Sequence, residues 1–318
     1  MIAENRCLQG VSGWCNVGFM TNAHVQKDIL NGLFKRENDG IFIRTSGIPR
    51  ALDEYNDALF DILMDLQSHH FWHRGRHRFV HYAFRRFLPL IERTESDLRV
   101  IDLGAGCGGW VQYLKRDQRY QFSECAMGDS YRRPLELARE CVGDDVNRYH
   151  VDLMDMGWRD RWDVVFLMDV IEHIDADIDI VRRVRDVLRP GGLLFITVPA
   201  LSFFWTINDE VTGHHRRYAR VDCVSIAKKT GMDLIQSRYF MFLLSPLYYI
   251  SRLWQPDYSG MSEQEIAETL AKVHRIPSPI INRVMGWIFN LETPLGSRIP
   301  FPWGTSLLAV YQRPHESH

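Results

Sequence analysis

Apolar residues recur at steps of three and four along the first strongly patterned part of the chain, which runs from residue 51 to residue 92. Such spacing places apolar side chains on one side of a helix. We expect one helix over ALDEYNDALFDILMDLQ and a second over about 74–90, which together form an N-terminal helical cap. Residues 1–50 show weak periodicity with scattered glycine and asparagine, so we treat them as a variable N-terminal extension.

From Leu98 onward, short apolar runs alternate with amphipathic segments. Near-continuous apolar runs are typical of strands that are buried on both faces of a parallel sheet, and this alternation predicts a doubly wound α/β fold. The helix between the runs RWDVVFLMDV and GGLLFITVPA should stop at Pro190-Gly191-Gly192, because this sequence is a strong helix terminator. The expected strands are, in order, LRVIDLGAG, YQFSECAMGDS, NRYHVDL, RWDVVFLMDV and GGLLFITVPA.

The rest of the chain adds one helix, two strands and a helical insertion. VDCVSIAKKTG predicts a helix that ends at Gly231, and MDLIQSRYFMF and SLLAVYQR predict the last two strands. The intervening residues 244–304 contain the apolar segments LSPLYYISRLW and IINRVMGWIFNLE, for which we expect helices. This insertion would either form a lid over the active-site edge of the sheet or rest on a membrane surface.

Composition narrows the classes of partner and compartment. The 318 residues are 46% hydrophobic and 25% charged, with a formal net charge of -2, which gives no general reason to expect a nucleic-acid partner. The six cysteines form no CxxC pair and no tight zinc spacing, which suits a reducing cytoplasm. We see no secretory signal and no run of about 18 apolar residues. We therefore expect a cytoplasmic protein without a transmembrane segment, with peripheral membrane contact left open and no prediction of oligomeric state.

A glycine-rich loop after the first expected strand is the strongest functional signal. It reads Asp102-Leu103-Gly104-Ala105-Gly106-Cys107-Gly108-Gly109. Glycines there permit a tight turn and let backbone amides approach a ligand, at the strand ends where such sheets bind nucleotides. The same glycines satisfy GxGxxG, so the loop alone is also compatible with NAD.

Acidic residues follow the next three strands. Asp129 and Ser130 end the second strand, where Asp129 can accept both ribose hydroxyls of an adenosine or serve as a helix N-cap. Asp152 ends the third strand and can accept the adenine amino group, while Leu153 covers the ring. The fourth strand runs into the acidic and basic sequence MDVIEHI at 168–174.

Taken in order, these segments resemble the class I S-adenosylmethionine-dependent methyltransferases. The match covers about residues 95–200 and rests on VIDLGAGCGG, GDSYRRPLELAR, VDL, WDVVFLMDVIEHI and LRPGGLLFITVP. The flanking segments HHFWHRGRHRFV, DEVTGHHRRY and PFPWGTSLLAV are similar to a narrower bacterial-type subgroup of small-molecule methyltransferases. The resemblance implies one methyltransferase domain over 51–318, S-adenosylmethionine as cofactor, and a seven-stranded, mostly parallel Rossmann-like sheet whose last strand is antiparallel.

The resemblance also implies which residues hold the two ends of the cofactor. The methionine carboxylate and amino groups would lie against Gly104, Ala105 and Gly106, with Asp102 supporting the loop. The ribose would bind Asp129.

Further positions would surround the adenine and the sulfonium. The adenine would lie near Asp152 and Leu153, and the backbone around Met168 and Asp169 would lie close to the cofactor.

The aromatic and basic segment HHFWHRGRH at 69–77 has two interpretations. Phe71 or Trp72 would cover the adenosine or the sulfonium, and Arg76 would meet the methionine carboxylate. Alternatively, the segment is a helix packed on the edge of the sheet. Its histidines suggest a metal, but no nearby carboxylate completes a ligand motif.

Methyl transfer to oxygen needs an aligned acceptor, excluded water and removal of a proton. The segment GHHRRY offers the best candidates for these roles. His214 or His215 would take a proton near neutral pH, and Tyr218 would orient the acceptor. Arg216 and Arg217 would bind a carboxylate or phosphate of the substrate. The alternative is a loop and helix start whose arginines pair with surface acids.

His173 is the second base candidate, because it follows Glu172 at the end of the fourth strand. Asp169, Glu172 and His173 would also permit a divalent cation. The same pattern is widespread in this fold, where it often only shapes the strand–helix turn, and we predict no metal.

The sequence therefore predicts an enzyme that methylates an oxygen or nitrogen atom of a small molecule, such as a saccharide, a lipid-linked intermediate or a secondary metabolite. An NAD-dependent oxidoreductase and a non-catalytic S-adenosylmethionine-binding protein are the alternatives. No hydride-transfer constellation is recognisable, and the acidic set Asp102, Asp129 and Asp152 is intact, which favours the methyltransferase.

Overall fold

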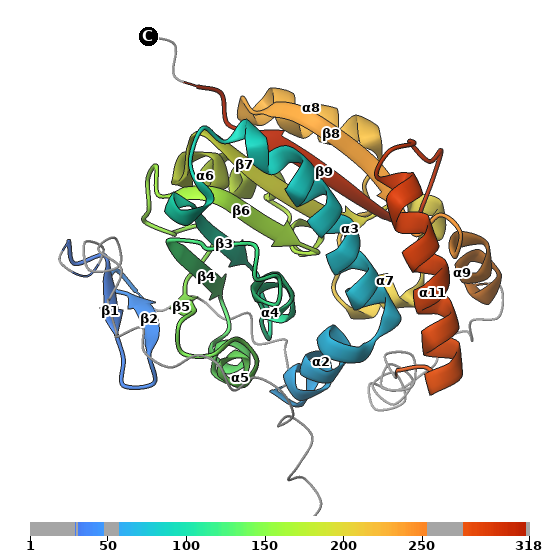
Figure 1. Cartoon of the computed structure of the whole chain (residues 1–318), viewed down its shortest axis with the longest axis horizontal. Helices are drawn as coiled ribbons and strands as arrows, with labels where there is room; N and C mark the ends of the chain where they lie inside the picture. The colour runs from blue at the N-terminus through green and yellow to red at the C-terminus, as the bar shows by residue number, and fades with distance from the viewer. Residues whose placement is uncertain (1–28, 30, 48–56, 253–275, 316–318) are drawn as a thin grey trace, which may run out of the picture.

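The computed structural model describes residue 29 and residues 31–47, 57–252 and 276–315. Within these ranges the chain forms one nine-stranded sheet with helices on both faces (Figure 1). The strands are β1 (Phe34–Arg36), β2 (Ile41–Arg44), β3 (Arg99–Leu103), β4 (Glu124–Asp129), β5 (Asn147–His150), β6 (Trp162–Met168), β7 (Leu188–Pro199), β8 (Asp233–Phe240) and β9 (Ser306–Gln312). The longer helices are α2 (Asp57–His69), α3 (Phe71–Phe87), α4 (Gly109–Lys115), α5 (Arg132–Val142), α6 (Asp177–Val187), α8 (Arg220–Thr230), α9 (Ser245–Arg252) and α11 (Pro279–Gly296).

The strand order is β1-β2-β5-β4-β3-β6-β7-β9-β8. The pairs from β5 through β7 are all parallel, whereas β9 runs antiparallel to both β7 and β8. The predicted doubly wound sheet with an antiparallel last strand is therefore confirmed. Chain order reverses at β3, which lies between β4 and β6, and the carboxyl ends of strands at such a reversal are where these sheets bind ligands.

The predicted count of seven strands was wrong, because β1 and β2 extend the sheet beyond β5. They form an antiparallel hairpin inside the segment that sequence analysis left without a role. β2 pairs in parallel with β5, and Phe34 of β1 is 1% exposed. Two strands of three and four residues are too short to give a readable alternation, so the pattern could not predict them.

Alternate side chains of the central strands point to opposite faces of the sheet and pack into two separate hydrophobic cores. Val165 and Leu167 of β6 face the cluster that is covered by α6 and α8. Val164 and Phe166 face the opposite cluster, which α3 and α11 cover. Both faces of the sheet are thus buried, as the apolar strands predicted.

The segment Pro190-Gly191-Gly192 lies inside β7 rather than after α6, so its predicted role as helix terminator was wrong. α6 ends at Val187, and β7 starts at Leu188. Leu188 pairs with Trp162 and Leu193 pairs with Val164, so the residues between them form a bulge. Glycine suits this bulge, because a Cβ at Gly192 would lie 2.8 Å from the carbonyl oxygen of Arg189.

The helices expected at 51–92, in VDCVSIAKKTG and in the 244–304 insertion are all present where the structure describes them. Residues 48–56 and 253–275 lie outside the described part. α8 ends at Thr230, and Gly231 adopts the left-handed conformation expected of a C-terminal cap. In the described ranges, no helix is both long enough and apolar enough to span a bilayer.

Candidate active site

The glycine loop after β3 lies against the ends of the two neighbouring strands. Gly104 has a φ of 69°, and its amide donates to the carbonyl oxygen of Gly128 on β4 at 2.8 Å. A Cβ at Gly104 would lie 2.5 Å from Cγ2 of Val170, which follows β6. Only glycine combines this backbone conformation with such a close approach. The loop thus lies at the point of the sheet where chain order reverses.

Asp129 at the end of β4 holds the glycine loop. Its two carboxylate oxygens accept from the amides of Gly106 and Tyr131, both at 2.9 Å. Burial raises the pKa of Asp129, and hydrogen bonds from Tyr131, Gly106 and Ser130 partly offset that effect. The sequence interpretation as a helix N-cap does not hold, since α5 starts after Tyr131 and its cap has no side-chain hydrogen bond.

Asp102 on β3 is buried behind the loop and only 3% exposed. Burial and the nearby charge of Asp129 raise its pKa to about 8, although Arg76 works in the opposite direction. Its Oδ1 has no hydrogen-bond partner among the described residues. One oxygen of the Asp102 carboxyl group is therefore unsatisfied immediately behind the loop.

Helix α2 covers the loop from the other side, which sequence analysis did not predict. The Gln67 side chain accepts from the amide of Gly109 at 3.1 Å. Cys107 Sγ contacts the carbonyl oxygen of Phe60 at 3.3 Å. A Cβ at Gly106 would approach Gln67 and Leu63 within about 3.2 Å. The helical period of α2 shows which residues share a side, but it cannot show what that side covers.

Helix α3 brings Arg76 to the end of β6. The Arg76 guanidinium forms an ion pair with Asp169, whose carboxylate also accepts from Thr197 Oγ1 at 3.2 Å. The same guanidinium lies 4.8 Å from the ring centroid of Trp72. Asp169 has a positive φ of 57°, and Met168 before it is 6% exposed. The predicted residues Arg76 of α3 and Asp169, just after β6, thus meet. In this structure Arg76 pairs with a carboxylate of the protein itself.

The residues expected near adenine follow β5, on the same edge of the sheet. Leu153 is 8% exposed, and Asp152 Oδ1 accepts from the amide of Met154 at 2.8 Å. Ser130, one residue beyond β4, is joined through its carbonyl oxygen to Nε2 of His150 at 3.0 Å. Asp129 is the last residue of β4, and Asp152 and Leu153 follow the paired strand β5 at the same end.

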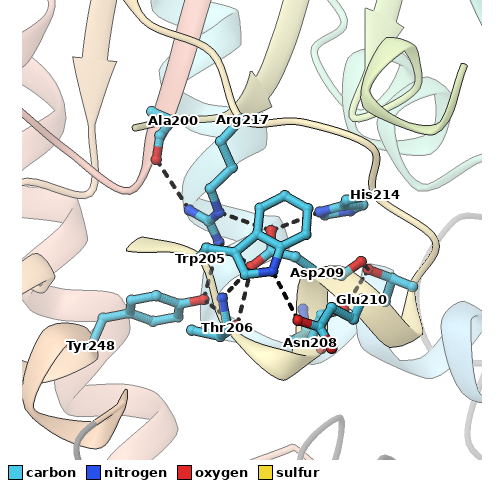
Figure 2. A network of polar contacts seen from close by, with 10 residues as sticks. Ala200, Trp205, Thr206, Asn208, Asp209, Glu210, His214, Arg217 and Tyr248 are labelled. Carbon is cyan, nitrogen blue, oxygen red and sulfur yellow. Dashed lines mark hydrogen bonds and ion pairs between the residues drawn. The ribbon is translucent and has the colours of Figure 1, made fainter. Parts of the chain in front are cut away.

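A buried network around Asp209 organises the GHHRRY segment (Figure 2). Asp209 lies on the short helix α7 (Ile207–Val211) and is fully buried. Its Oδ1 bonds to Nδ1 of His214 at 2.8 Å and accepts from Nε of Arg217 at 2.8 Å. Its Oδ2 accepts from Arg217 Nη2 at 2.9 Å and from the amide of Thr206 at 2.8 Å. Burial would raise the pKa of Asp209, but the bonds from His214 and Arg217 outweigh it and lower the pKa to about 2.

This network fixes the proton on His214. An ionised carboxylate can only accept, so Nδ1 of His214 carries a hydrogen and Nε2 of the neutral ring is an acceptor. The His214 side chain is 13% exposed. It is therefore a largely buried ring with one defined basic nitrogen.

His214 also lies against the end of β6. Its ring is 4.7 Å from that of His173, centroid to centroid, in an edge-on arrangement. Burial and His214 lower the pKa of His173 to about 4. Glu172 is fully buried, neither of its carboxyl oxygens has a hydrogen-bond partner among the described residues, and burial with the charge of Asp169 raises its pKa. Glu172, His173 and His214 each offer a ligand atom within 4.8 Å of the others.

The other residues of GHHRRY lie differently. Nδ1 of His215 bonds to the highly exposed Asp175 at 2.6 Å, and Arg216 pairs with Asp175 and Asp177. Tyr218 is 3% exposed, and its hydroxyl donates to Asp177 at 2.9 Å. This side chain is therefore part of the protein interior. The guanidinium of Arg217 forms two hydrogen bonds with the carboxylate of Asp209 through Nε and Nη2. This edge of the guanidinium is therefore not available for a substrate anion. The alternative expectation, that these arginines pair with surface acids, describes the pairing of Arg216 with Asp175, whereas the partner of Arg217 is the fully buried Asp209.

Comparison with known proteins gives a family match. Residues 71–240, just over half of the chain, match the family described as methyltransferase domain. The matched range contains the glycine loop, β6, and Asp209 with its partners Thr206, His214 and Arg217.

Two curated relatives are ubiquinone biosynthesis O-methyltransferases. The protein of Mesorhizobium japonicum is 30% identical over 115 residues, which cover 34% of this chain and 43% of that protein. The protein of Ruegeria pomeroyi is 32% identical over 108 residues, which cover 32% of this chain and 41% of that protein. The alignment thus spans about two fifths of the length of these curated relatives.

Solved structures share the fold. A chain from the complex between the Haloferax volcanii Trm112 methyltransferase activator and a methyltransferase has a TM-score of 0.53 at 16% identity, covering 83% of this chain and all of that chain. Phosphoethanolamine N-methyltransferase 2 of Haemonchus contortus, in complex with S-adenosyl-L-methionine, has a TM-score of 0.51 at 19% identity. It covers 83% of this chain and 59% of that one.

Proposed function

Because the chain belongs to the family of methyltransferase domains, we propose that it transfers the methyl group of S-adenosylmethionine to a hydroxyl oxygen of a small molecule. The observation that carries the choice of oxygen is the buried Asp209–His214 pair, which supplies a base beside the end of β6. An oxygen acceptor must lose a proton in the reaction, and a positioned imidazole can take it.

The residues around the glycine loop fit a cofactor. The loop glycines let backbone amides come close to a ligand, and Asp129 and Asp152 lie at the carboxyl ends of adjacent strands at the same edge of the sheet. We propose that Gly104 and Gly106 hold the methionine end and Asp129 the ribose. S-adenosylmethionine supplies a methyl group that is already activated on a sulfonium, so the protein needs no covalent nucleophile.

We assign the general base to His214 rather than His215. Nδ1 of His214 bonds to a fully buried carboxylate, which fixes the tautomer and supports the positive charge that forms when Nε2 takes a proton. The partner of His215 is Asp175, whose side chain is 84% exposed and therefore gives weak, solvent-screened support. Asp209 is a positioning residue in this scheme.

The two curated relatives support oxygen as the acceptor atom, since both are named O-methyltransferases. They do not fix the acceptor of this chain, because the alignment covers less than half of either protein. We propose hydroxylated small molecules as the class to screen, including saccharides, lipid-linked intermediates and secondary metabolites.

The test compares His214→Gln with His215→Gln in the full chain. Methyl transfer from labelled S-adenosylmethionine to a panel of hydroxylated acceptors identifies a substrate first. We expect His214→Gln to lower kcat by about 100-fold or more, as loss of a general base does, with unchanged cofactor affinity in calorimetry. His215→Gln should stay close to the parent protein. Full activity of His214→Gln would move the base elsewhere, with His173 next to it as the first candidate.

A divalent cation is the second candidate for the same step. It is favoured by one observation, the fully buried Glu172 carboxyl without a hydrogen-bond partner among the described residues, close to His173 and His214. Such an ion would polarise a hydroxyl acceptor and lower its pKa. Titration with manganese or zinc in a calorimeter tests it, with Glu172→Gln as the variant that should lose binding. Turnover that survives chelation would leave His214 acting alone.

A further inference from the structure

Helix α11 carries a continuous apolar stripe on the surface of the protein. Ile280 is 75% exposed and Trp287 is 62% exposed. Residues at these spacings line one side of a helix. We define the α11 apolar face as Ile280, Val284, Trp287, Leu291 and Leu295. Exposed apolar residues gathered in this way mark an interaction surface, whereas single scattered ones do not.

The opposite side of α11 is firmly attached to α3, so the stripe is held outward. Phe289 is fully buried and lies against Gly75 of α3, where a Cβ would be 2.0 Å from the ring. Asn282 accepts from the amide of Phe71 at 2.8 Å and donates to the carbonyl oxygen of His69 at 2.9 Å. Figure 1 shows α11 alongside α3 at the margin of the molecule.

Helix α9 also exposes apolar side chains. The turn before it is tied to α11, because the amide of Leu243 donates to the buried carboxyl of Glu292 at 2.8 Å. Leu247 and Ile250 of α9 are about half exposed. The described helices of the insertion thus both expose apolar side chains.

The exposed charged side chains on the described residues of α3, α9 and α11 have one sign. In the described parts of α3, α9 and α11, the single carboxylate is Glu292, which is fully buried. The exposed charged side chains of these helices are Arg74, Arg85 and Arg86 of α3 and Arg283 of α11, and the exposed Arg298 lies two residues beyond the end of α11. A negatively charged surface would complement these arginines electrostatically.

We propose that the α11 apolar face docks onto the surface of a bilayer containing anionic lipids. An apolar stripe with tryptophan, bordered by arginines and free of exposed acids, is the pattern of a helix that lies in the lipid interface. The arginines can keep their charged groups at the headgroups while the stripe enters the acyl boundary. This contact is interfacial, since no described helix has the length and apolar character of a membrane span.

The helix that carries this surface packs on the helix that reaches the proposed active site. Gly75 of α3 contacts α11, while the next residue, Arg76, reaches Asp169 at the end of β6. One helix thus joins the docking face to the cofactor edge of the sheet. Docking itself does not depend on the proposed reaction, and its test measures lipid binding without an acceptor.

The experiment is cosedimentation of the full chain with vesicles of phosphatidylcholine alone or with added phosphatidylserine. We expect binding to the anionic vesicles that weakens with salt. The double variant Trp287→Ser, Leu291→Ser should lower the partition coefficient about tenfold or more. Val221→Ser is the matched control, because Val221 is 70% exposed on α8, on the other face of the sheet.

A second pair of variants tests the charges. Arg283→Glu with Arg298→Glu should abolish the preference for anionic vesicles, while Lys228→Glu on α8 should leave it unchanged. Absence of binding to either vesicle, or equal binding by the Trp287→Ser, Leu291→Ser protein, would overturn the proposal. So would a dimer in sedimentation velocity that the same double variant dissolves, because the face would then be an interface between two copies.

Discussion

At the scale of single residues, the site depends on carboxyl groups that are buried for different reasons. Asp209 receives hydrogen bonds from His214, Arg217 and Thr206, so its charge is compensated inside the protein. Removing one partner from such a buried pair leaves an uncompensated charge and costs about 3–5 kcal/mol. These bonds hold the carboxylate of Asp209 in place, and its bond to Nδ1 fixes the orientation of the His214 ring.

Asp102 presents the opposite case, and we predict that its substitution changes how stability depends on pH. Its folded pKa is about 8 because of burial, whereas the unfolded value is about 3.9. Between these values the folded protein holds one proton more than the unfolded chain. The contribution of Asp102 to the free energy of unfolding therefore falls by about 1.4 kcal/mol per pH unit as pH rises, and levels off above about pH 8.

Asp102→Asn removes this slope. The stability of the variant relative to the parent, from urea unfolding without cofactor, should grow between about pH 5 and about pH 8 and then stay constant. The slopes of groups that do not interact with Asp102 cancel in this difference. A difference that does not change with pH would mean that Asp102 is already ionised in the folded protein.

At the scale of elements, the close approach of α3 and α11 depends on one glycine. A Cβ at Gly75 would lie 2.0 Å from Cδ1 of Phe289, which is fully buried. We predict that Gly75→Ala lowers the free energy of unfolding by about 1–3 kcal/mol, because overpacking outweighs the gain in helix propensity.

Gly286→Ala is the matched control on the partner helix. A Cβ there would meet only ordinary contact, 3.7 Å from Cβ of Phe71. We expect this variant to be neutral or more stable by up to about 1 kcal/mol, as measured by denaturant unfolding. Equal destabilisation by both changes would show that the two helices do not meet at Gly75.

Periodicity predicted elements well where they were long and failed where they were short or bent. The central strands and α8 follow the pattern closely, because both faces of the sheet are buried and Gly231 ends the helix. The bulge around Gly191 was misread, since Pro-Gly-Gly stops a helix and also fits a bulged strand. Local sequence cannot separate these two uses, because the difference lies in what the strand pairs with.

At the scale of the whole molecule, the sequence predicted which residues gather at the site better than what each of them touches. Positions at the carboxyl ends of neighbouring strands must meet, so Asp129 and Asp169 could be placed from topology alone. The pairing of Arg217 with Asp209, and the cover that Gln67 gives the glycine loop, depend on the packing of distant segments. No spacing rule in one sequence carries that information.

The hairpin β1–β2 is the largest feature that the sequence did not predict, and we expect it to be an integral part of the domain. Phe34 is 1% exposed, stacks on Trp158 at 5.0 Å and meets Tyr149 edge-on at 5.1 Å. Arg132 of α5 also pairs with Glu37 in the hairpin turn at 2.7 Å. These contacts join β1 to the same core as the central strands.

Phe34→Ala should therefore lower the free energy of unfolding of the whole domain by about 3–5 kcal/mol, the cost of deleting a buried aromatic ring. Lys35→Ala on the same strand is exposed and should change stability by no more than about 0.5 kcal/mol. Denaturant unfolding followed by tryptophan fluorescence measures both, since Trp158 reports on this corner. If the hairpin were an appendage, Phe34→Ala would leave the main transition where it is, whereas an integral hairpin must shift that transition because its phenylalanine belongs to the shared core.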